Sequence, residues 1–242
     1  MLLLAIGVSD YLNDDYDLQF SAIDAIDFNK ALKAQQGKFY REVESKVLTD
    51  KQATRSGIQD GMDWLYERVE PDDIAVIFIS GHGVYDPRNN FYFANYETDV
   101  KRLRSTALAY TEIESAIKDM PCKILLFADT CHAGAARGFG AIRDPWTDLV
   151  SGEIGAILFA SSTPREESQE SDEWGHGAFT YALLESLKQR KTDVTGDGMI
   201  SLTELELSIG EKVRLLTDDQ QHPTTQKPGT IPNFNIAVSG TE

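Results

Sequence analysis

Four short runs of apolar residues constrain the fold of this chain more than any other feature. They are Leu2–Val8, Ile74–Ser80, Lys123–Ala128 and Ile154–Ala160, and a weaker run covers Val43–Leu48. Each run is almost continuously apolar, whereas a strand with one face in water alternates apolar and polar side chains. The pattern therefore predicts strands of a sheet that is covered on both faces.

The segments between these runs are typical of amphipathic helices. Apolar residues from Ile58 to Val69 recur at a 4-3-4 spacing, which places them on one stripe of a helix. Residues 20–34, Phe179–Leu187 and Leu205–Leu216 show similar helical patterns. Because strands and helices alternate along the chain, the predicted fold class is α/β with a mostly parallel sheet.

Two segments show neither pattern and are predicted to be long loops. Residues 132–152 are rich in glycine and alanine, and residues 162–177 are acidic and polar. Long loops in a compact domain are usually functional or disordered. Both segments follow predicted strands, and sites in open α/β sheets form beyond the carboxyl ends of the strands. We therefore expect the functional site at that edge.

Composition limits the partners and the compartment. The 242 residues include 39 acidic and 23 basic side chains, so the formal net charge is −16. Such a chain repels phosphates, and we expect neither a nucleic acid nor a membrane as partner. No apolar run approaches the roughly 18 residues of a membrane span, and the apolar start is typical of a buried strand rather than a signal peptide. Two cysteines are too few for a disulfide framework, which indicates a cytoplasmic protein with reduced thiols.

One of the two cysteines lies where a nucleophile is expected. The stretch KILLFADTCHAG leads from a predicted strand into a loop and places Cys131 just past the carboxyl end of the strand. A thiol becomes a good nucleophile as the thiolate, which a neighbouring imidazole favours. Cys122 stands at a strand start and is interpreted as an inert buried residue.

His82 is the predicted partner of Cys131 among the four histidines. It follows the second apolar run, so parallel neighbouring strands would bring it to the same edge as the cysteine. His132 is adjacent to Cys131 in sequence, and successive side chains on an extended backbone point apart. His176 precedes a helix, where its flanking glycines ease a turn, and His222 lies in a predicted surface turn.

The glycine after His82 has a predicted role of its own. Attack by a thiolate creates negative charge on the carbonyl oxygen of the substrate. Because Gly83 has no side chain, its backbone N–H can approach this oxygen. The N–H groups of Gly83 and Cys131 are expected to form an oxyanion hole, in which each donor is worth about 3 kcal/mol.

These motifs resemble those of the caspase-like cysteine peptidases, most closely the metacaspase and bacterial caspase-like (orthocaspase) branch. SGHG follows one apolar strand and DTCHAG another, and His82 and Cys131 are about 50 positions apart. The resemblance implies one domain over residues 1–242, with a p20-like part (1–150) and a p10-like part (151–242). It also implies a six-stranded, mainly parallel sheet with helices on both faces, and peptide hydrolysis through an acyl-enzyme.

The resemblance further implies the specificity. In metacaspases an acidic residue two positions before the catalytic cysteine lines the S1 pocket, and Asp129 has this place. A carboxylate pairs well with a guanidinium, so the predicted substrate is a protein or peptide with Arg or Lys at the cut site. The alternative is that Asp129 only caps a turn. The 163–173 loop is expected to supply a second acidic group, for which Glu166, Glu167 and Glu170 are all candidates.

The sequence contains one candidate calcium site and implies no required cofactor. The stretch DVTGDGMISLTE matches an EF-hand loop with Asp193, Asp197 and Glu204 as ligands. Thr195 stands at the third position instead of Asp or Asn, and a glycine-rich turn before a helix is the alternative. The aspartate that follows the catalytic cysteine in many metacaspases is missing, so we do not expect calcium activation by that route.

The predicted function is a thiol protease that cleaves after Arg or Lys through a Cys–His dyad. One alternative is a catalytically silent scaffold with the same fold, which the retention of both His82 and Cys131 argues against. Another is a cysteine hydrolase acting on a non-peptide acyl group, and the acidic pocket favours a basic peptide instead. The resemblance also indicates a bacterial protein that is monomeric, or one part of a larger multidomain protein.

Overall fold

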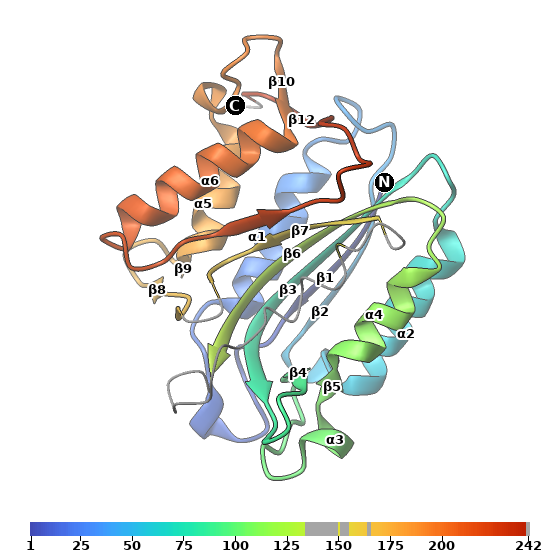
Figure 1. Cartoon of the computed structure of the whole chain (residues 1–242), viewed down its shortest axis with the longest axis vertical. Helices are drawn as coiled ribbons and strands as arrows, with labels where there is room; N and C mark the ends of the chain where they lie inside the picture. The colour runs from blue at the N-terminus through green and yellow to red at the C-terminus, as the bar shows by residue number, and fades with distance from the viewer. Residues whose placement is uncertain (134–149, 151–154, 164–165, 241–242) are drawn as a thin grey trace.

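A parallel sheet forms the centre of the molecule. The structure is a computed structural model that describes residues 1–133, 150, 155–163 and 166–240, and only the backbone of 131–133. Its main strands are β1 (Leu2–Gly7), β2 (Glu44–Thr49), β3 (Ile74–Tyr85), β6 (Lys123–Ala133), β7 (Ala156–Ala160) and β11 (Thr224–Gln226). They lie in the order β11-β7-β6-β3-β1-β2 (Figure 1), and all neighbours on this path are parallel except β11 and β7.

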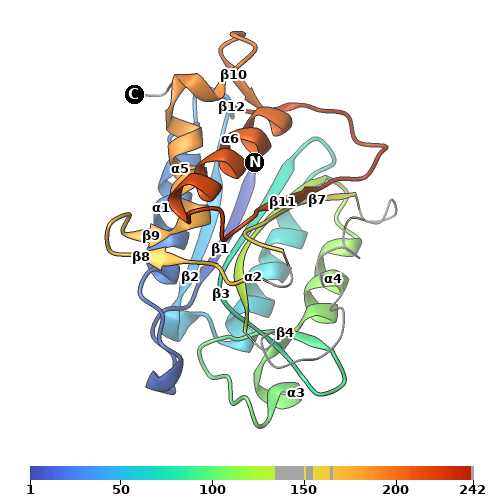
Figure 2. The ribbon, with the colours of Figure 1, turned by 60° about the vertical axis from the view of Figure 1, so that its left-hand side comes forward.

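Helices cover both faces of this sheet, which confirms the predicted fold class. Figures 1 and 2 show α2 and α4 against one face and α1, α5 and α6 against the other. The helices are α1 (Ser21–Lys33), α2 (Arg55–Arg68), α3 (Leu103–Thr106), α4 (Tyr110–Lys118), α5 (Ala178–Lys188) and α6 (Leu202–Leu216). In the part of the chain described, every helix is too short or too polar to cross a membrane.

The two helical layers explain why the strands are apolar on both sides. In β1, Leu4 and Ile6 pack into the cluster that contains the α2 residue Leu65, while Leu3 packs into the opposite cluster with Phe28 of α1. All five side chains are fully buried. Burying one such side chain stabilises the fold by about 1.5–3 kcal/mol, so both faces of the sheet contribute.

Several short strands lie beside the main path. They are β4 (Phe91–Phe93), β5 (Leu108–Ala109), β8 (Glu170–Ser171), β9 (His176–Gly177), β10 (Met199–Ser201) and β12 (Asn235–Val238). Strand β4 pairs with the end of β3 and with β5, and this addition is beyond the six strands that were expected. The pairs β8–β9 and β10–β12 form small separate sheets.

The two segments predicted to be long loops, 162–177 and 132–152, have different outcomes. Segment 162–177 is not a continuous loop, because β8 and β9 pair within it and bring His176 opposite Ser171. Most of segment 132–152 lies outside the described residues. Strands β3 and β6 run past their apolar cores, to Tyr85 and Ala133, because backbone pairing continues through the polar motifs.

Candidate active site

The register of the sheet brings the two predicted catalytic residues together. Strands β3 and β6 pair in parallel from Ile74 and Lys123 onwards, and His82 stands directly opposite Cys131. Neighbouring strands lie about 4.8 Å apart, so the two backbones are as close as two strands can be. The side chain of Cys131 lies outside the described part of the structure, and the pairing is a statement about the backbone.

The ring of His82 is held in place through one of its two nitrogens. Its Nε2 lies 2.9 Å from the carbonyl oxygen of Tyr16, which can only accept, so Nε2 carries the proton. Its Nδ1 is buried and has no hydrogen-bond partner among the described residues. Burial lowers the pKa of His82, although the bond to Tyr16 and the charge of Glu170 oppose this. The neutral ring thus keeps a lone pair on Nδ1 that can accept a proton.

Tyr11 contacts both the backbone and the ring of His82. The backbone N–H of His82 donates to the hydroxyl of Tyr11 at 3.1 Å, and the two rings lie 5.5 Å apart. A side chain on Gly81 would place its Cβ 3.0 Å from the Tyr11 hydroxyl and 3.1 Å from Phe93, and Gly81 has a φ of 150°. The first glycine of the Gly-His-Gly motif is therefore required by both space and conformation.

An acidic pocket adjoins this pair. Asp129 lies on β6 opposite Ser80, is 6% exposed, and accepts a hydrogen bond from the Thr180 hydroxyl at 2.7 Å. Asp24 of α1 is 2% exposed and lines the same pocket, which has a volume of about 70 Å³. None of the described residues that line it is basic; they are Leu18, Ser21, Asp24, Ser80, Gly81, Asp129, Ser168, Gln169, Glu170 and Gly177.

The two buried carboxyl groups hold their protons unusually tightly. Burial, together with the charge of Asp24, raises the pKa of Asp129 to about 7. Burial likewise raises the pKa of Asp24 to about 6, although hydrogen bonds from His176 and Gly177 and the charge of His176 oppose the rise. Two adjacent carboxylates without a cation in the pocket cost free energy, which a bound cationic group would offset.

The structure separates the three glutamates that the sequence left as alternatives. Glu170 lines the pocket, and its carboxylate accepts N–H groups from Gln19 and Phe20 just before α1. Glu166 instead accepts a hydrogen bond from the ring of His222 at 2.8 Å, and Glu167 is exposed outside the pocket. Of the three, only Glu170 stands beside Asp129.

Asp24 is a pocket residue that sequence reasoning missed. It belongs to the apolar stripe of α1, whose buried members also include Ser21, Ala25, Phe28 and Leu32. A carboxylate on the buried stripe of a helix is costly unless it has a function or a partner. The acidic residue on an otherwise buried helix stripe was the sequence signal for a functional role of Asp24. It does not reveal which distant residues the carboxylate contacts.

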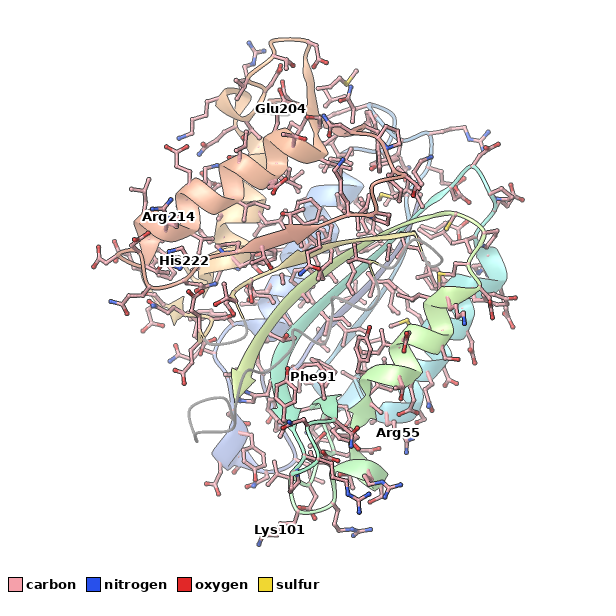
Figure 3. The ribbon with its side chains drawn as sticks, in the orientation of Figure 1. Arg55, Phe91, Lys101, Glu204, Arg214 and His222 are labelled. Atoms are coloured by element: carbon pink, nitrogen blue, oxygen red, sulfur yellow. The ribbon has the colours of Figure 1, made fainter. Side chains whose placement is uncertain are left out.

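The carboxylates of the predicted calcium loop accept hydrogen bonds from the chain itself. Asp193 accepts the N–H groups of Gly196 and Gly198, and Glu204 accepts those of Thr195 and Ser201. In the described residues, no group of three or more His, Cys, Asp and Glu side chains is placed to hold a metal ion. Figure 3 shows Glu204 at the end of the molecule opposite the carboxyl ends of β3 and β6. Calcium binding stays a prediction.

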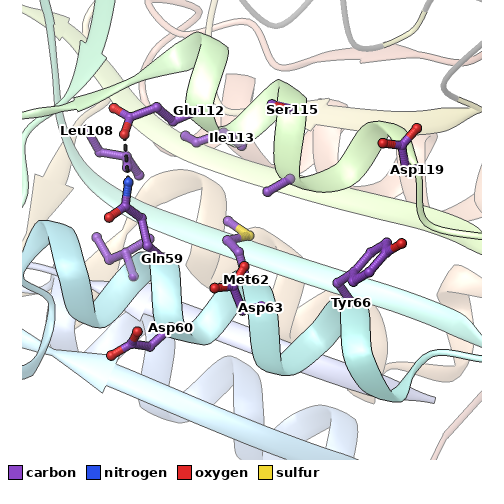
Figure 4. A pocket seen from close by; sticks show the side chains of 12 residues that line it. Gln59, Asp60, Met62, Asp63, Tyr66, Leu108, Glu112, Ile113, Ser115 and Asp119 are labelled. Carbon is purple, nitrogen blue, oxygen red and sulfur yellow. Dashed lines mark hydrogen bonds between the residues drawn. The ribbon is translucent and has the colours of Figure 1, made fainter.

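A second pocket of about 560 Å³ lies between α2 and α4 (Figure 4). Met62 and Ile113 contribute apolar surface to its lining, and Asp60, Asp63 and Asp119 contribute carboxylates. None of the residues predicted for catalysis or specificity lines it.

The fold and the site define a class of protein. Helices on both faces of a parallel sheet, with a histidine and a cysteine at the ends of adjacent strands, are the arrangement of a caspase-like domain. The family described as Caspase domain matches residues 2–233. The chain therefore belongs to the caspase domain family, which supports a cysteine peptidase kind of function.

Particular relatives agree with this assignment. The chain is 26% identical over 165 residues to Metacaspase-1 of Schizosaccharomyces pombe. That match covers 62% of this chain and only 37% of the length of the relative. The crystal structure of protein GSU0716 from Geobacter sulfurreducens superimposes with a TM-score of 0.69 at 17% identity, over 96% of this chain and 94% of that one. This likeness shows a shared fold.

Proposed function

We propose that the chain is a cysteine endopeptidase that cleaves peptide bonds after arginine or lysine. One observation carries the proposal: His82 stands opposite Cys131 in the β3–β6 register, beside a pocket with two buried carboxyl groups. Cys131 is the nucleophile, and His82 is the general base and acid. Family membership supports the chemistry, and the acidic pocket supports the specificity.

The reaction follows from the proton positions on His82. The free lone pair on Nδ1 accepts the thiol proton of Cys131, and the thiolate attacks the carbonyl carbon of the peptide. The imidazolium then protonates the leaving amine, and a C–S bond remains in the acyl-enzyme. Water, activated by the neutral ring, hydrolyses this thioester and releases the thiol. The backbone N–H groups of Gly83 and Cys131 hold the negative oxygen in each step.

The carbonyl oxygen of Tyr16 assists both steps. It accepts a hydrogen bond from Nε2 at 2.9 Å, so the ring of His82 keeps one orientation and one tautomer. When Nδ1 takes up a proton, the ring becomes cationic, and the carbonyl dipole and the charge of Glu170 stabilise that cation. His82 is thus a neutral base before the reaction, and its protonated form is stabilised by the Tyr16 carbonyl and Glu170.

The acidic pocket selects the side chain at the cut site. A guanidinium or ammonium group in the pocket lies between Asp24 and Asp129, which otherwise repel each other. Leaving a buried charge without its partner costs about 3–5 kcal/mol. A neutral or acidic side chain at this position therefore loses two or more orders of magnitude in kcat/KM.

Fluorogenic peptides that end in Arg, Lys or Asp test the proposal. Wild type should cleave the Arg and Lys peptides, and Cys131→Ala or His82→Ala should lower kcat by about a thousandfold or more. His222→Ala is the matched control, because this histidine pairs with Glu166 and lies outside the pocket. Cleavage after Asp alone would overturn the role of Asp129. A folded protein that cleaves no peptide would support the alternative of a catalytically silent scaffold. Cleavage of simple thioesters alone would support the alternative of a cysteine hydrolase that acts on a non-peptide acyl group.

A further inference from the structure

The second Gly-His-Gly stretch, residues 175–177, adjoins the acidic pocket, which Gly177 lines. Strand β9, His176–Gly177, holds both carboxylate oxygens of Asp24: Nδ1 of His176 lies 2.7 Å from Oδ1, and the backbone N–H of Gly177 donates to Oδ2 at 3.3 Å. His176 is 152 positions and Gly177 is 153 positions from Asp24 in sequence. The motif therefore fixes the orientation of a pocket residue on another element.

Gly177 leaves the space that the two carboxylates need. A Cβ at this position would lie 2.9 Å from Oδ2 of Asp129 and 3.3 Å from Oδ2 of Asp24. Its φ of −64° is available to any residue, so the glycine is required for space and not for conformation. The backbone of β9 can thus approach both acids of the pocket at once.

His176 lies between the pocket and a second set of charges. Its Nε2 is 3.7 Å from Asp27 of α1, and its side chain is 15% exposed. Lys30 of α1 and Lys188 of α5 line the adjoining pocket of about 370 Å³, and Lys30 pairs with Asp27 at 2.7 Å. The acidic groups that line the acidic pocket, besides Asp24, are Asp129 of β6 and Glu170 of β8. Of these charged groups, Asp24 lies within hydrogen-bond distance of the His176 ring.

We propose that His176 is a positioning residue that keeps Asp24 oriented and ionised, and that it thereby sets the pH above which the enzyme selects arginine. This inference rests on the proposed function, because it requires the side chain at the cut site to enter the acidic pocket. His176 acts through Asp24 and does not itself touch the substrate.

The electrostatics of the pocket support this role. Burial raises the pKa of Asp24 even with His176 in place, and the hydrogen bond and charge of the imidazole are the first two influences that oppose the rise. Without the ring, Asp24 faces Asp129 with fewer groups to stabilise its charge, and it takes up a proton at a higher pH. A guanidinium then meets a pocket that has lost one of its negative charges.

Two peptides that differ in one residue isolate this effect. One ends in arginine and the other in citrulline, which has almost the same shape and no charge. The ratio of their kcat/KM values is measured from about pH 5 to about pH 9, and titration of His82 and Cys131 cancels in this ratio. In wild type the ratio should fall as the pH drops through the range in which Asp129 and Asp24 take up protons, about 7 to about 6.

The His176 variants should shift this profile. In His176→Ala the midpoint of the ratio should move up by about one pH unit. His176→Gln keeps a hydrogen-bond donor without a charge and should give an intermediate shift. Circular dichroism verifies that each variant folds. His222→Ala should leave the profile unchanged, and Asp24→Asn should lower the ratio at every pH.

The outcomes separate this inference from the proposed function. An upward shift in both His176 variants supports the positioning role. A ratio that falls equally at every pH, with the midpoint in place, would show a purely structural role and overturn the inference alone. If wild type cleaves the arginine peptide and neither variant moves the midpoint, the inference also fails. If wild type cleaves neither peptide, the proposed function fails and the inference fails with it.

Discussion

Replacing Asp129 by asparagine should make the protein more stable while it removes cleavage after arginine. The carboxyl group is 6% exposed, and it accepts hydrogen bonds from Thr180 and Ser161. Burial and the neighbouring Asp24 make its charged form costly. Asparagine has the same shape, keeps an oxygen for the hydroxyl donors, and removes the repulsion. The pocket then has one fewer charge for a guanidinium.

The size and pH dependence of the effect follow from the pKa of Asp129. It is raised from 3.8 to about 7, and each pKa unit is worth about 1.4 kcal/mol, so ionising the folded carboxyl costs about 4 kcal/mol. The stability that the protonated group contributes is complete below its ordinary pKa and is lost as the pH rises to about 7. Asp129→Asn should therefore stabilise by about 1–4 kcal/mol at pH 8, and by less than half as much at pH 5.

Urea unfolding of the two proteins at both pH values measures this difference. Asp86→Asn is a control of opposite sign, because hydrogen bonds from Asn90 and Arg88 lower the pKa of the Asp86 carboxyl although burial opposes them. That variant should be no more stable than wild type at pH 8. If Asp129→Asn proved equally or less stable than wild type at pH 8, the carboxyl would not be held at an electrostatic cost, and the reasoning about the pocket would be refuted.

Two further substitutions test the pocket wall and the loop of the calcium prediction. Gly177→Ala places a methyl group 2.9 Å from Asp129 Oδ2. It should destabilise the protein by about 1–3 kcal/mol in urea unfolding and raise KM for arginine peptides. An unchanged KM would contradict the close approach. Glu204 is 5% exposed, and although burial opposes its charge, hydrogen bonds from Ser201 and Thr195 lower its pKa to about 2. Glu204→Gln should therefore lower the free energy of unfolding by about 1–2 kcal/mol at neutral pH, where the charged group stabilises the fold. In acid unfolding, this difference should shrink as the pH falls towards 2. Equal stability of the two proteins at neutral pH would refute the prediction.

Much of the candidate site was predictable because it lies at the ends of strands. The apolar runs before His82 and Cys131 mark two buried strands, and parallel strands end at one edge of a sheet. The register that places them directly opposite each other agrees with that prediction. The predicted long loop at 162–177 was wrong, because the two-residue strands β8 and β9 are too short to leave a periodic signal.

The class of fold and the position of the candidate dyad could be predicted from local patterns, namely the continuous apolar runs and the Gly-His-Gly and Asp-Thr-Cys motifs. The residues that complete the acidic pocket could not be predicted in this way, because they come together only in the packed fold. Asp24, Asp129 and His176 come from a helix, a central strand and a short hairpin, and they meet only after the sheet and its helices have packed. Their contacts depend on side-chain positions across those elements, which no spacing along the chain encodes.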